Sequence, residues 1–170
     1  TIFYCGSCGP GKGINRLVEL AKYLDDYQFQ VATLEDYKNE NIKKEWQIYN
    51  INWLGRLSRE ELVNNINSAE YCILPNDPEH NSNQYSSPMK LFEYMSKGKA
   101  LILSSIPTVM EIFNSDDYIE LPINISSSNI RSILKKTNSN ELGKRSFASI
   151  KKFTWERRAK NFLRYKRRER

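Results

Sequence analysis

The chain has 170 residues, 39% of them hydrophobic and 12% aromatic, which is long and apolar enough for one domain with its own core. No apolar run approaches the roughly 20 residues of a membrane-spanning helix. The three cysteines, Cys5, Cys8 and Cys72, are an odd and sparse set that argues against a disulfide scaffold and predicts a reducing compartment, the cytoplasm. The formal net charge is +6, and the basic residues gather at the C-terminal end.

In the first half of the chain, apolar strands are predicted to alternate with helices. A strand over 2–5 leads through a glycine-rich loop to a helix whose apolar residues recur at helical spacing, namely Ile14, Leu17, Val18, Ala21 and Leu24. Strands are predicted over 29–34 and 48–54, with a polar helix or loop over 36–45 between them. Residues 58–61 have the form of a capping box, which predicts a helix that buries Leu62, Val63 and Ile66.

The second half continues this alternation. Residues 71–74 and 100–103 are compact apolar segments, typical of strands buried on both faces of a parallel sheet. A strand is predicted over 118–121, and a helix after Pro107 carries Val109, Met110, Ile112 and Phe113. The last helices are predicted near 129–136, 139–151 and 154–166. The pattern predicts an α/β fold: a Rossmann-like, doubly wound parallel sheet of about six strands, with helices on both faces and ligands at the carboxyl ends of the strands.

The segment from Gly6 to Gly13 matches the phosphate-loop pattern G-x-x-x-x-G-K-[ST] except at its last position. Gly13 there has no hydroxyl group to ligate magnesium. Three interpretations stay open on the residues alone: a P-loop NTPase, a glycine-rich turn with a surface lysine, and a flexible backbone that faces a diphosphate together with Lys12.

Cys5 and Cys8 form a C-x-x-C pair, which together with Cys72 and the single histidine, His80, leaves a zinc site or a dithiol redox site as alternatives. The spacing beyond the first pair is not that of a standard zinc module, and the strands predicted downstream do not follow the thioredoxin order. We therefore expect Cys5 to be a buried strand residue and Cys8 a loop residue, with no metal bound.

Aromatic and basic residues raise the alternative of nucleic-acid binding. Trp53 lies in a predicted strand, and Trp155 starts an amphipathic helix with Ala159, Phe162 and Leu163, so we expect both tryptophans to pack in the core and no nucleic acid to bind. Residues 151–170 form a predicted basic C-terminal helix with ten Lys or Arg residues against two Glu. Such a helix suits an anionic partner, or is simply solvated.

A helix is also predicted from Ser86 or Ser87, the candidate N-cap residues, to Gly98, with Pro88 in its first turn. Backbone N–H groups at its start form a candidate anion site. Glu93 lies one to two turns inside, where its carboxylate can accept hydrogen bonds from hydroxyl groups of the same ligand. This combination suits a nucleotide sugar, whereas an exposed glutamate on a helix is the plain alternative.

Taken together, these residues resemble the C-terminal half of retaining GT-B glycosyltransferases of the GT4 type. The matching segments follow in order along nearly the whole chain: Gly6-Ser7 with Lys12-Gly13, Trp53 to Leu57 with Glu60 to Leu62, Ser87 to Lys99, Ser104 to Glu111, and Phe153 to Trp155. The resemblance implies that residues 1–170 are a nucleotide-sugar donor-binding domain, and that the N-terminal acceptor domain of such an enzyme is absent from this chain.

The resemblance also implies roles for individual residues. Lys12 would neutralise the diphosphate, and Glu93 would bind the ribose hydroxyls as the second glutamate of an E-x7-E element, so these two are the candidate catalytic residues. The remaining donor contacts would come from Gly6, Ser7, Gly55, Arg56, Leu57, Tyr85, Ser86, Ser87, Pro88 and Met89. Two positions depart from the family: Tyr85 replaces the first glutamate, and Ser7 replaces the usual arginine.

The function that this resemblance implies is transfer of a sugar from a UDP- or GDP-linked donor to a glycan or a lipid-linked acceptor, in surface polysaccharide synthesis. No cofactor is expected, and this chain without its N-terminal domain should bind the donor but not turn over. The basic helix would face an anionic membrane at the inner face or a polyprenyl-phosphate acceptor. Tyr85 and Ser7 keep a second interpretation open, a non-catalytic nucleotide or nucleotide-sugar binding module.

Overall fold

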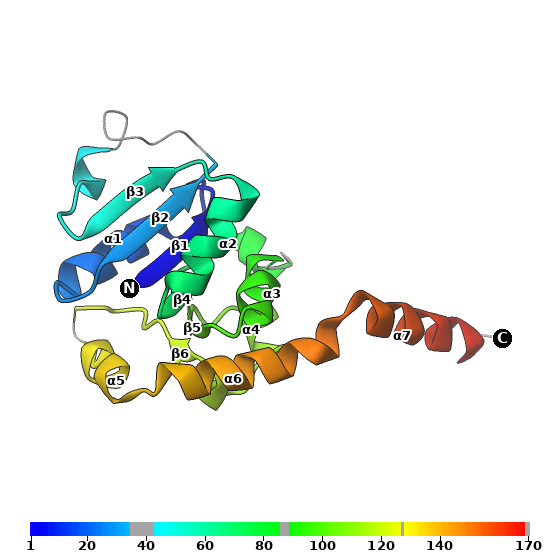
Figure 1. Ribbon diagram of the computed structural model, residues 1–170. Helices are drawn as coiled ribbons and strands as arrows, with labels where there is room; N and C mark the ends of the chain where they lie inside the picture. Colours follow the sequence, from blue (N-terminus) through cyan, green and yellow to red (C-terminus); the bar gives the residue numbers. More distant parts are fainter. Residues whose placement is uncertain (35–42, 86–88, 127, 169–170) are drawn as a thin grey trace.

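The computed structural model describes residues 1–34, 43–85, 89–126 and 128–168. In this part of the chain one parallel sheet has six strands in the order β3-β2-β1-β4-β5-β6 (Figure 1). The strands are β1 (Ile2–Gly6), β2 (Phe29–Thr33), β3 (Ile51–Gly55), β4 (Tyr71–Leu74), β5 (Ala100–Leu103) and β6 (Ile119–Glu120). The predicted doubly wound sheet is thus confirmed. The strand order reverses between β1 and β4, and ligands of such sheets bind at this switch point.

Helices cover both faces of the sheet. The α-helices of the described residues are α1 (Ile14–Tyr23), α2 (Arg59–Ser68), α3 (Met89–Ser96), α4 (Pro107–Met110), α5 (Ile130–Lys136), α6 (Ser139–Ile150) and α7 (Trp155–Arg168). Buried residues of α1 and α5 pack on one face, and those of α2, α3 and α4 pack on the other. β4 and β5 therefore have apolar neighbours on both faces, which explains their continuous apolar runs.

Local hydrogen bonds explain where the elements begin and end. The capping box of α2 forms as predicted, because the Ser58 hydroxyl accepts from the Glu61 N–H and the Glu61 carboxylate accepts from the Ser58 N–H. β3 begins at Ile51 and not at residue 48, because the Ile51 N–H donates to the Ile48 carbonyl and closes a turn there. α4 is a single turn, shorter than predicted, because it ends at Met110, and the 3-10 turn η3 (Ser115–Asp117) follows it.

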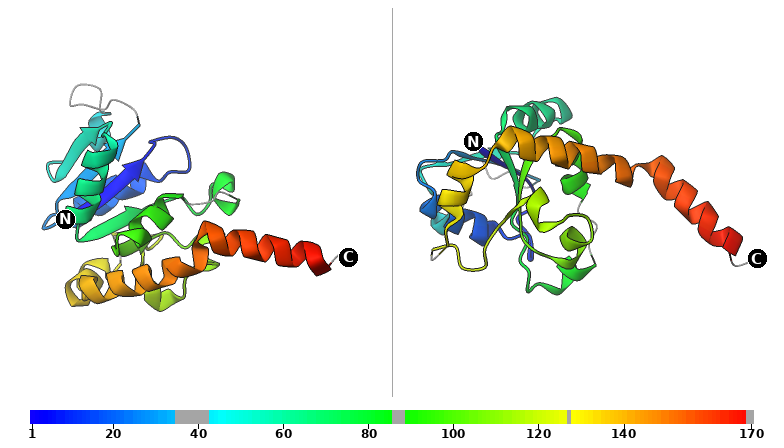
Figure 2. Two further views of the ribbon diagram at one scale, coloured as in Figure 1. Left: turned by 45° about the vertical axis from the view of Figure 1, so that its right-hand side comes forward. Right: turned by 90° about the horizontal axis from the view of Figure 1, so that it is seen from below.

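The prediction that Trp155 packs in the core is wrong. Its side chain is 74% exposed, and Phe162 and Leu163 are exposed as well. Figure 1 and both views of Figure 2 show the reason, because α7 leaves the body of the domain and extends away from the sheet. Trp53, in contrast, is buried in β3 and stacks on Trp46 with ring centroids 5.7 Å apart.

None of the helices in the described ranges is both long and apolar enough to cross a membrane.

Candidate functional site

Two loops meet at the switch point of the sheet. The loop from β1 to α1 carries Lys12, and the segment after β4 leads through the 3-10 turn η2 (Asn81–Gln84) to Tyr85. The N–H of Asp77 donates to the carbonyl of Gly11 at 3.0 Å, which joins the two loops directly. The sequence pattern placed a ligand at this edge of the sheet, and the structure brings the candidate loops together there.

Lys12 lies between two positions, 11 and 13, that only glycine can occupy. Gly11 and Gly13 have φ angles of +76° and +73°, in the left-handed region. A Cβ atom on Gly13 would lie 1.9 Å from the carbonyl oxygen of Pro75, and one on Gly11 would lie 2.7 Å from the ring of His80. The backbone on either side of Lys12 therefore lies in close contact with the segment after β4. This contact explains why glycine stands on both sides of Lys12, although the last position lacks the hydroxyl group of a phosphate loop.

Glu93 lies on α3, which packs on the face of the sheet opposite to α1. Its side chain is 13% exposed, Oε2 accepts from Lys90 Nζ at 2.8 Å, and Oε1 pairs with Arg59. Burial raises the pKa of the Glu93 carboxyl, but the hydrogen bonds and charges of Lys90 and Arg59 outweigh burial and hold the pKa below its ordinary value. The carboxylate is consequently ionised at neutral pH, as an acceptor for ligand hydroxyls must be.

The turn after β3 approaches Glu93 through Arg59. Gly55 has a φ of +64°, Arg56 is exposed, and Leu57 is partly buried against the core under α2 and α3. The capping box then fixes the first residue of α2, Arg59, opposite α3. Arg59, which follows this turn, thus connects the predicted donor-binding residues Gly55, Arg56 and Leu57 to the predicted ribose-binding carboxylate.

The end of β1 is anchored to the same helix. The N–H of Cys5 donates to the hydroxyl of Tyr94 at 2.8 Å, and the hydroxyl of Tyr4 donates to the carbonyl of Ser7 at 2.8 Å. A Cβ atom on Gly6 would lie 2.5 Å from the Tyr4 hydroxyl, so a larger residue here would displace the Tyr4 side chain. Gly6 and Ser7 therefore have a fixed place between Lys12 and α3.

Tyr85 and Met89 flank the predicted anion site. Both side chains are exposed, that of Tyr85 by 86%. Ser86, Ser87 and Pro88, the other predicted members of this site, lie outside the described residues.

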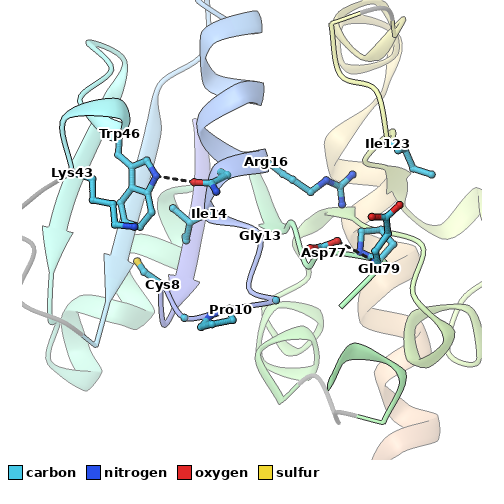
Figure 3. Close-up of a pocket in the computed structure, with 14 residues that line it drawn as sticks. Cys8, Pro10, Gly13, Ile14, Arg16, Lys43, Trp46, Asp77, Glu79 and Ile123 are labelled. Carbon is cyan, nitrogen blue, oxygen red and sulfur yellow. Dashed lines mark hydrogen bonds between the residues drawn. The ribbon is translucent and has the colours of Figure 1, made fainter. Parts of the chain in front are cut away.

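A cavity of about 510 Å³ lies beside the β1–α1 loop (Figure 3). Trp46 and Lys43 line one side, and Asp77 and Glu79 line the other, with the glycine-rich loop between them. None of the predicted site residues that the structure describes lines this cavity, although Lys12 lies between two glycines that do. Sequence reasoning missed it because Trp46 and Glu79 come from segments without a recognisable motif.

Arg16 lines this cavity and connects several segments of the chain by hydrogen bonds. Its guanidinium donates to the carbonyls of Asn76 and Pro122 at 2.9 Å and to Ser104 Oγ at 2.7 Å. It thereby joins α1 to the segments that follow β4, β5 and β6. Burial lowers the pKa of the Arg16 guanidinium, against the opposing charges of Asp77 and Glu19. Because both Nη atoms donate to acceptors of the protein, Arg16 acts as a structural cation at this end of the sheet.

The cysteines do not form a site among the described residues, where no three metal-ligating side chains of the His, Cys, Asp and Glu types come together. Cys5 ends up partly buried in β1, Cys8 in the loop, and Cys72 buried in β4. Burial raises the pKa of the Cys72 thiol strongly, so this cysteine stays protonated and unreactive.

Comparison with known proteins starts from the sequence. Residues 13–164 match the model of a family described as glycosyl transferase-like. No curated protein sequence matches the chain significantly.

Solved structures share its fold. Sucrose-phosphate synthase from Thermosynechococcus elongatus matches 98% of this chain and 45% of its own, with a TM-score of 0.76 and 18% identity. Anabaena HepE in complex with UDP-glucose matches 88% of this chain and 43% of its own, with a TM-score of 0.67 and 12% identity. The catalytic domain of cholesterol-alpha-glucosyltransferase from Helicobacter pylori matches 91% of this chain and 100% of its own, with a TM-score of 0.63 and 13% identity.

This chain spans less than half the length of the first two of these structures. At such identities the structures establish the fold alone, the Rossmann-like sheet of GT-B glycosyltransferases. The family model, in contrast, covers most of the sequence. The chain therefore belongs to the glycosyl transferase-like family.

Proposed function

We propose that this chain is the donor-binding, C-terminal half of a GT4-type glycosyltransferase, which transfers a sugar from a nucleoside-diphosphate sugar. The observation that carries the proposal is that Lys12 follows β1 in the loop to α1, while Glu93 lies on α3, which the hydrogen bond from the Cys5 N–H to the Tyr94 hydroxyl joins to the end of β1. One supplies a positive charge, and the other supplies an ionised acceptor. A nucleoside diphosphate offers a matching anion and matching ribose hydroxyls.

In the proposed reaction, the bond between the sugar and the diphosphate breaks, and negative charge develops on the leaving phosphate. Lys12 acts where that charge develops, because its backbone is held by Gly11 and Gly13 while its side chain is partly exposed. Glu93 holds the ribose and so fixes the leaving group relative to Lys12. The turn at Gly55, Arg56 and Leu57 borders the base.

Structural relatives support a nucleotide-sugar ligand. The Anabaena HepE structures contain UDP-glucose, UDP with glucose, or UDP alone, and they match this chain with TM-scores from 0.65 to 0.67. On this basis we propose a UDP-linked donor, with the GDP-linked donor that the family resemblance implies as the alternative.

The acceptor side of the proposal is a glycan or a lipid-linked acceptor in surface polysaccharide synthesis, bound together with an N-terminal domain of the same protein. α7 supports an anionic contact, since it exposes Trp155 and Leu163 and carries Arg157, Lys160 and Arg164. A cationic amphipathic helix of this kind suits the surface of an anionic membrane or a lipid phosphate. We accordingly place the protein on the cytoplasmic side, at the periphery of the membrane.

Tyr85 favours a second candidate function, a nucleotide-sugar binding module without catalysis. It stands at the first position of the E-x7-E element, and its exposed phenol cannot replace a carboxylate near the transferred sugar. Sugar transfer or donor hydrolysis by the protein that includes the N-terminal domain separates the two candidates.

Calorimetric titration of the chain with UDP- and GDP-sugars, with and without magnesium, tests donor binding. We expect binding in both conditions, and a loss of about tenfold in affinity for Lys12→Ala and for Glu93→Gln, because each removes a charge-assisted contact. Lys22→Ala, at the far end of α1, and Glu60→Gln, on the exposed side of α2, are the matched controls. Magnesium-dependent binding of ATP, without binding of nucleotide sugars, would contradict the proposal.

A further inference from the structure

The side chain of Asn83 is buried at the switch point, with 1% exposed. Its Nδ2 donates to the carbonyls of Gly11 and Asp77, both at 2.8 Å, and its Oδ1 accepts from Asn76 Nδ2 at 2.9 Å. Both donor hydrogens and the acceptor of the amide are therefore used. Asn83 joins the loop of Lys12 to two points of the segment that follows β4.

Only an amide fits between these groups. The two oxygens that face Nδ2 are carbonyls, which accept and never donate. An aspartate would place a carboxylate against both, and an alanine or a leucine would leave two partly buried carbonyls without this donor. The position thus has a chemical requirement that its burial alone does not explain.

The contact acts on the residue before Lys12. The carbonyl of Gly11 accepts from Asn83 Nδ2 at 2.8 Å and from the Asp77 N–H at 3.0 Å, so the peptide unit between Gly11 and Lys12 is held from two directions. Asn83 belongs to η2, and Tyr85 follows two residues later as its C-cap. The side chain of Asn83 therefore fixes both the backbone next to Lys12 and the start of the segment that leads to α3.

We infer that Asn83 is a positioning residue, which holds Lys12 so that its ammonium group meets the diphosphate of the nucleotide sugar. The inference rests on the proposed function, because it takes that diphosphate as the ligand. Asn83 itself does not touch the ligand. Its removal should weaken the phosphate part of binding and leave the ribose and base part, at Glu93 and Arg56, unchanged.

Asn50 provides a matched comparison within the chain. It is 0% exposed, and its Nδ2 donates to the carbonyls of Ala21, Leu24 and Tyr27 at 2.9, 3.1 and 3.0 Å. This asparagine ties loops at the amino ends of β2 and β3, the opposite end of the sheet from Lys12. Loss of either amide removes buried hydrogen bonds, but only Asn83 is connected to the phosphate side of the site.

The experiment compares binding of a nucleoside diphosphate with binding of its nucleoside, UDP against uridine and GDP against guanosine, by calorimetry on the 170-residue chain. For Asn83→Ala we expect about a tenfold loss of affinity for the diphosphate and less than about a twofold loss for the nucleoside. Combined with Lys12→Ala, it should cause little further loss, because both changes remove the same contact. Asn50→Ala should change neither affinity.

Asn76→Ala is the second variant. It removes only the hydrogen bond that Asn76 Nδ2 donates to Asn83 Oδ1, so it should perturb the fold less than Asn83→Ala does. It should give a smaller loss, again confined to the diphosphate. Equal losses for diphosphate and nucleoside, full additivity with Lys12→Ala, or the same selective loss in Asn50→Ala would each overturn the inference. If the unaltered chain binds no nucleoside diphosphate, the proposed function fails. If it binds and Asn83→Ala and Asn76→Ala bind equally well, only the positioning role fails.

Discussion

Lys90 Nζ lies 2.8 Å from Glu93 Oε2, one helical turn apart on α3. Arg59, from the start of α2, holds the other carboxylate oxygen. A carboxylate offers about four acceptor positions, so two hydrogen-bond donors from the protein orient Glu93 and leave positions for ligand hydroxyls. The pair thus prepares the acceptor before any ligand arrives, and it makes the charge of Glu93 dependent on Lys90.

Replacing Lys90 by methionine should raise the pKa of Glu93, because only Arg59 then remains to lower the pKa against the effect of burial, which raises it. A carboxyl whose pKa is lowered by folding stabilises the fold above its ordinary pKa of 4.5, and this stabilisation is lost as the pH falls through the lowered value. We therefore expect Lys90→Met to be less stable than the parent at neutral pH, by less than about 1 kcal/mol for this partly exposed pair. The difference should shrink as the solution is acidified below pH 4.5.

Urea unfolding of both proteins across this pH range measures the effect. Lys97→Met, which removes an exposed lysine just after the end of α3, is the control and should show no such pH dependence. A stability difference between Lys90→Met and the parent that stays constant with pH would contradict the coupling.

Gly13→Ala should lower the free energy of unfolding by about 2 kcal/mol or more. The new Cβ would lie 1.9 Å from the Pro75 carbonyl oxygen, in a backbone conformation with φ of +73° that alanine rarely adopts. Gly9→Ala in the same loop is the matched control, because its Cβ would meet nothing nearer than 3.9 Å. We expect the control to stay within about 0.5 kcal/mol of the parent in urea unfolding. Equal effects of the two substitutions would contradict the close contact between the backbone beside Lys12 and the segment after β4.

Arg16→Lys should destabilise the fold by about 2 kcal/mol or more, although the charge is kept. A lysine has no planar fork with which to reach the carbonyls of Asn76 and Pro122 and the Ser104 hydroxyl together. Thermal unfolding compares this variant with Arg145→Lys, at an exposed position on α6. A melting temperature equal to that of the control would show that the hydrogen bonds of Arg16 contribute nothing.

Removal of α7 by truncation after Thr154 should change the free energy of unfolding by less than about 1 kcal/mol, because Trp155 and Leu163 are exposed. Truncation after Ile150 should cost more, since it also removes Phe153, whose ring lies 5.5 Å from that of Phe92. Circular dichroism during thermal unfolding compares the two. A large loss of stability in the shorter truncation, after Thr154, would mean that α7 packs on the domain.

The fold could be predicted from the sequence because β4 and β5 are continuous apolar runs and α1 has a clear helical period. Lys12 and Glu93 could be singled out because each lies in a recognisable motif. Their supporting residues could not, since Arg59 lies 34 positions before Glu93, and Asn83 lies 72 positions after Gly11. Trp155 was placed wrongly because an amphipathic pattern shows which side of a helix is apolar, but not what covers it.

The most direct test of the account is a crystal structure of the chain with a bound UDP- or GDP-sugar. The account predicts the diphosphate within hydrogen-bonding distance of Lys12 Nζ, and the ribose hydroxyls within hydrogen-bonding distance of the Glu93 carboxylate. A nucleotide bound in the cavity between Trp46 and Glu79, with Glu93 still paired only to Lys90 and Arg59, would contradict it.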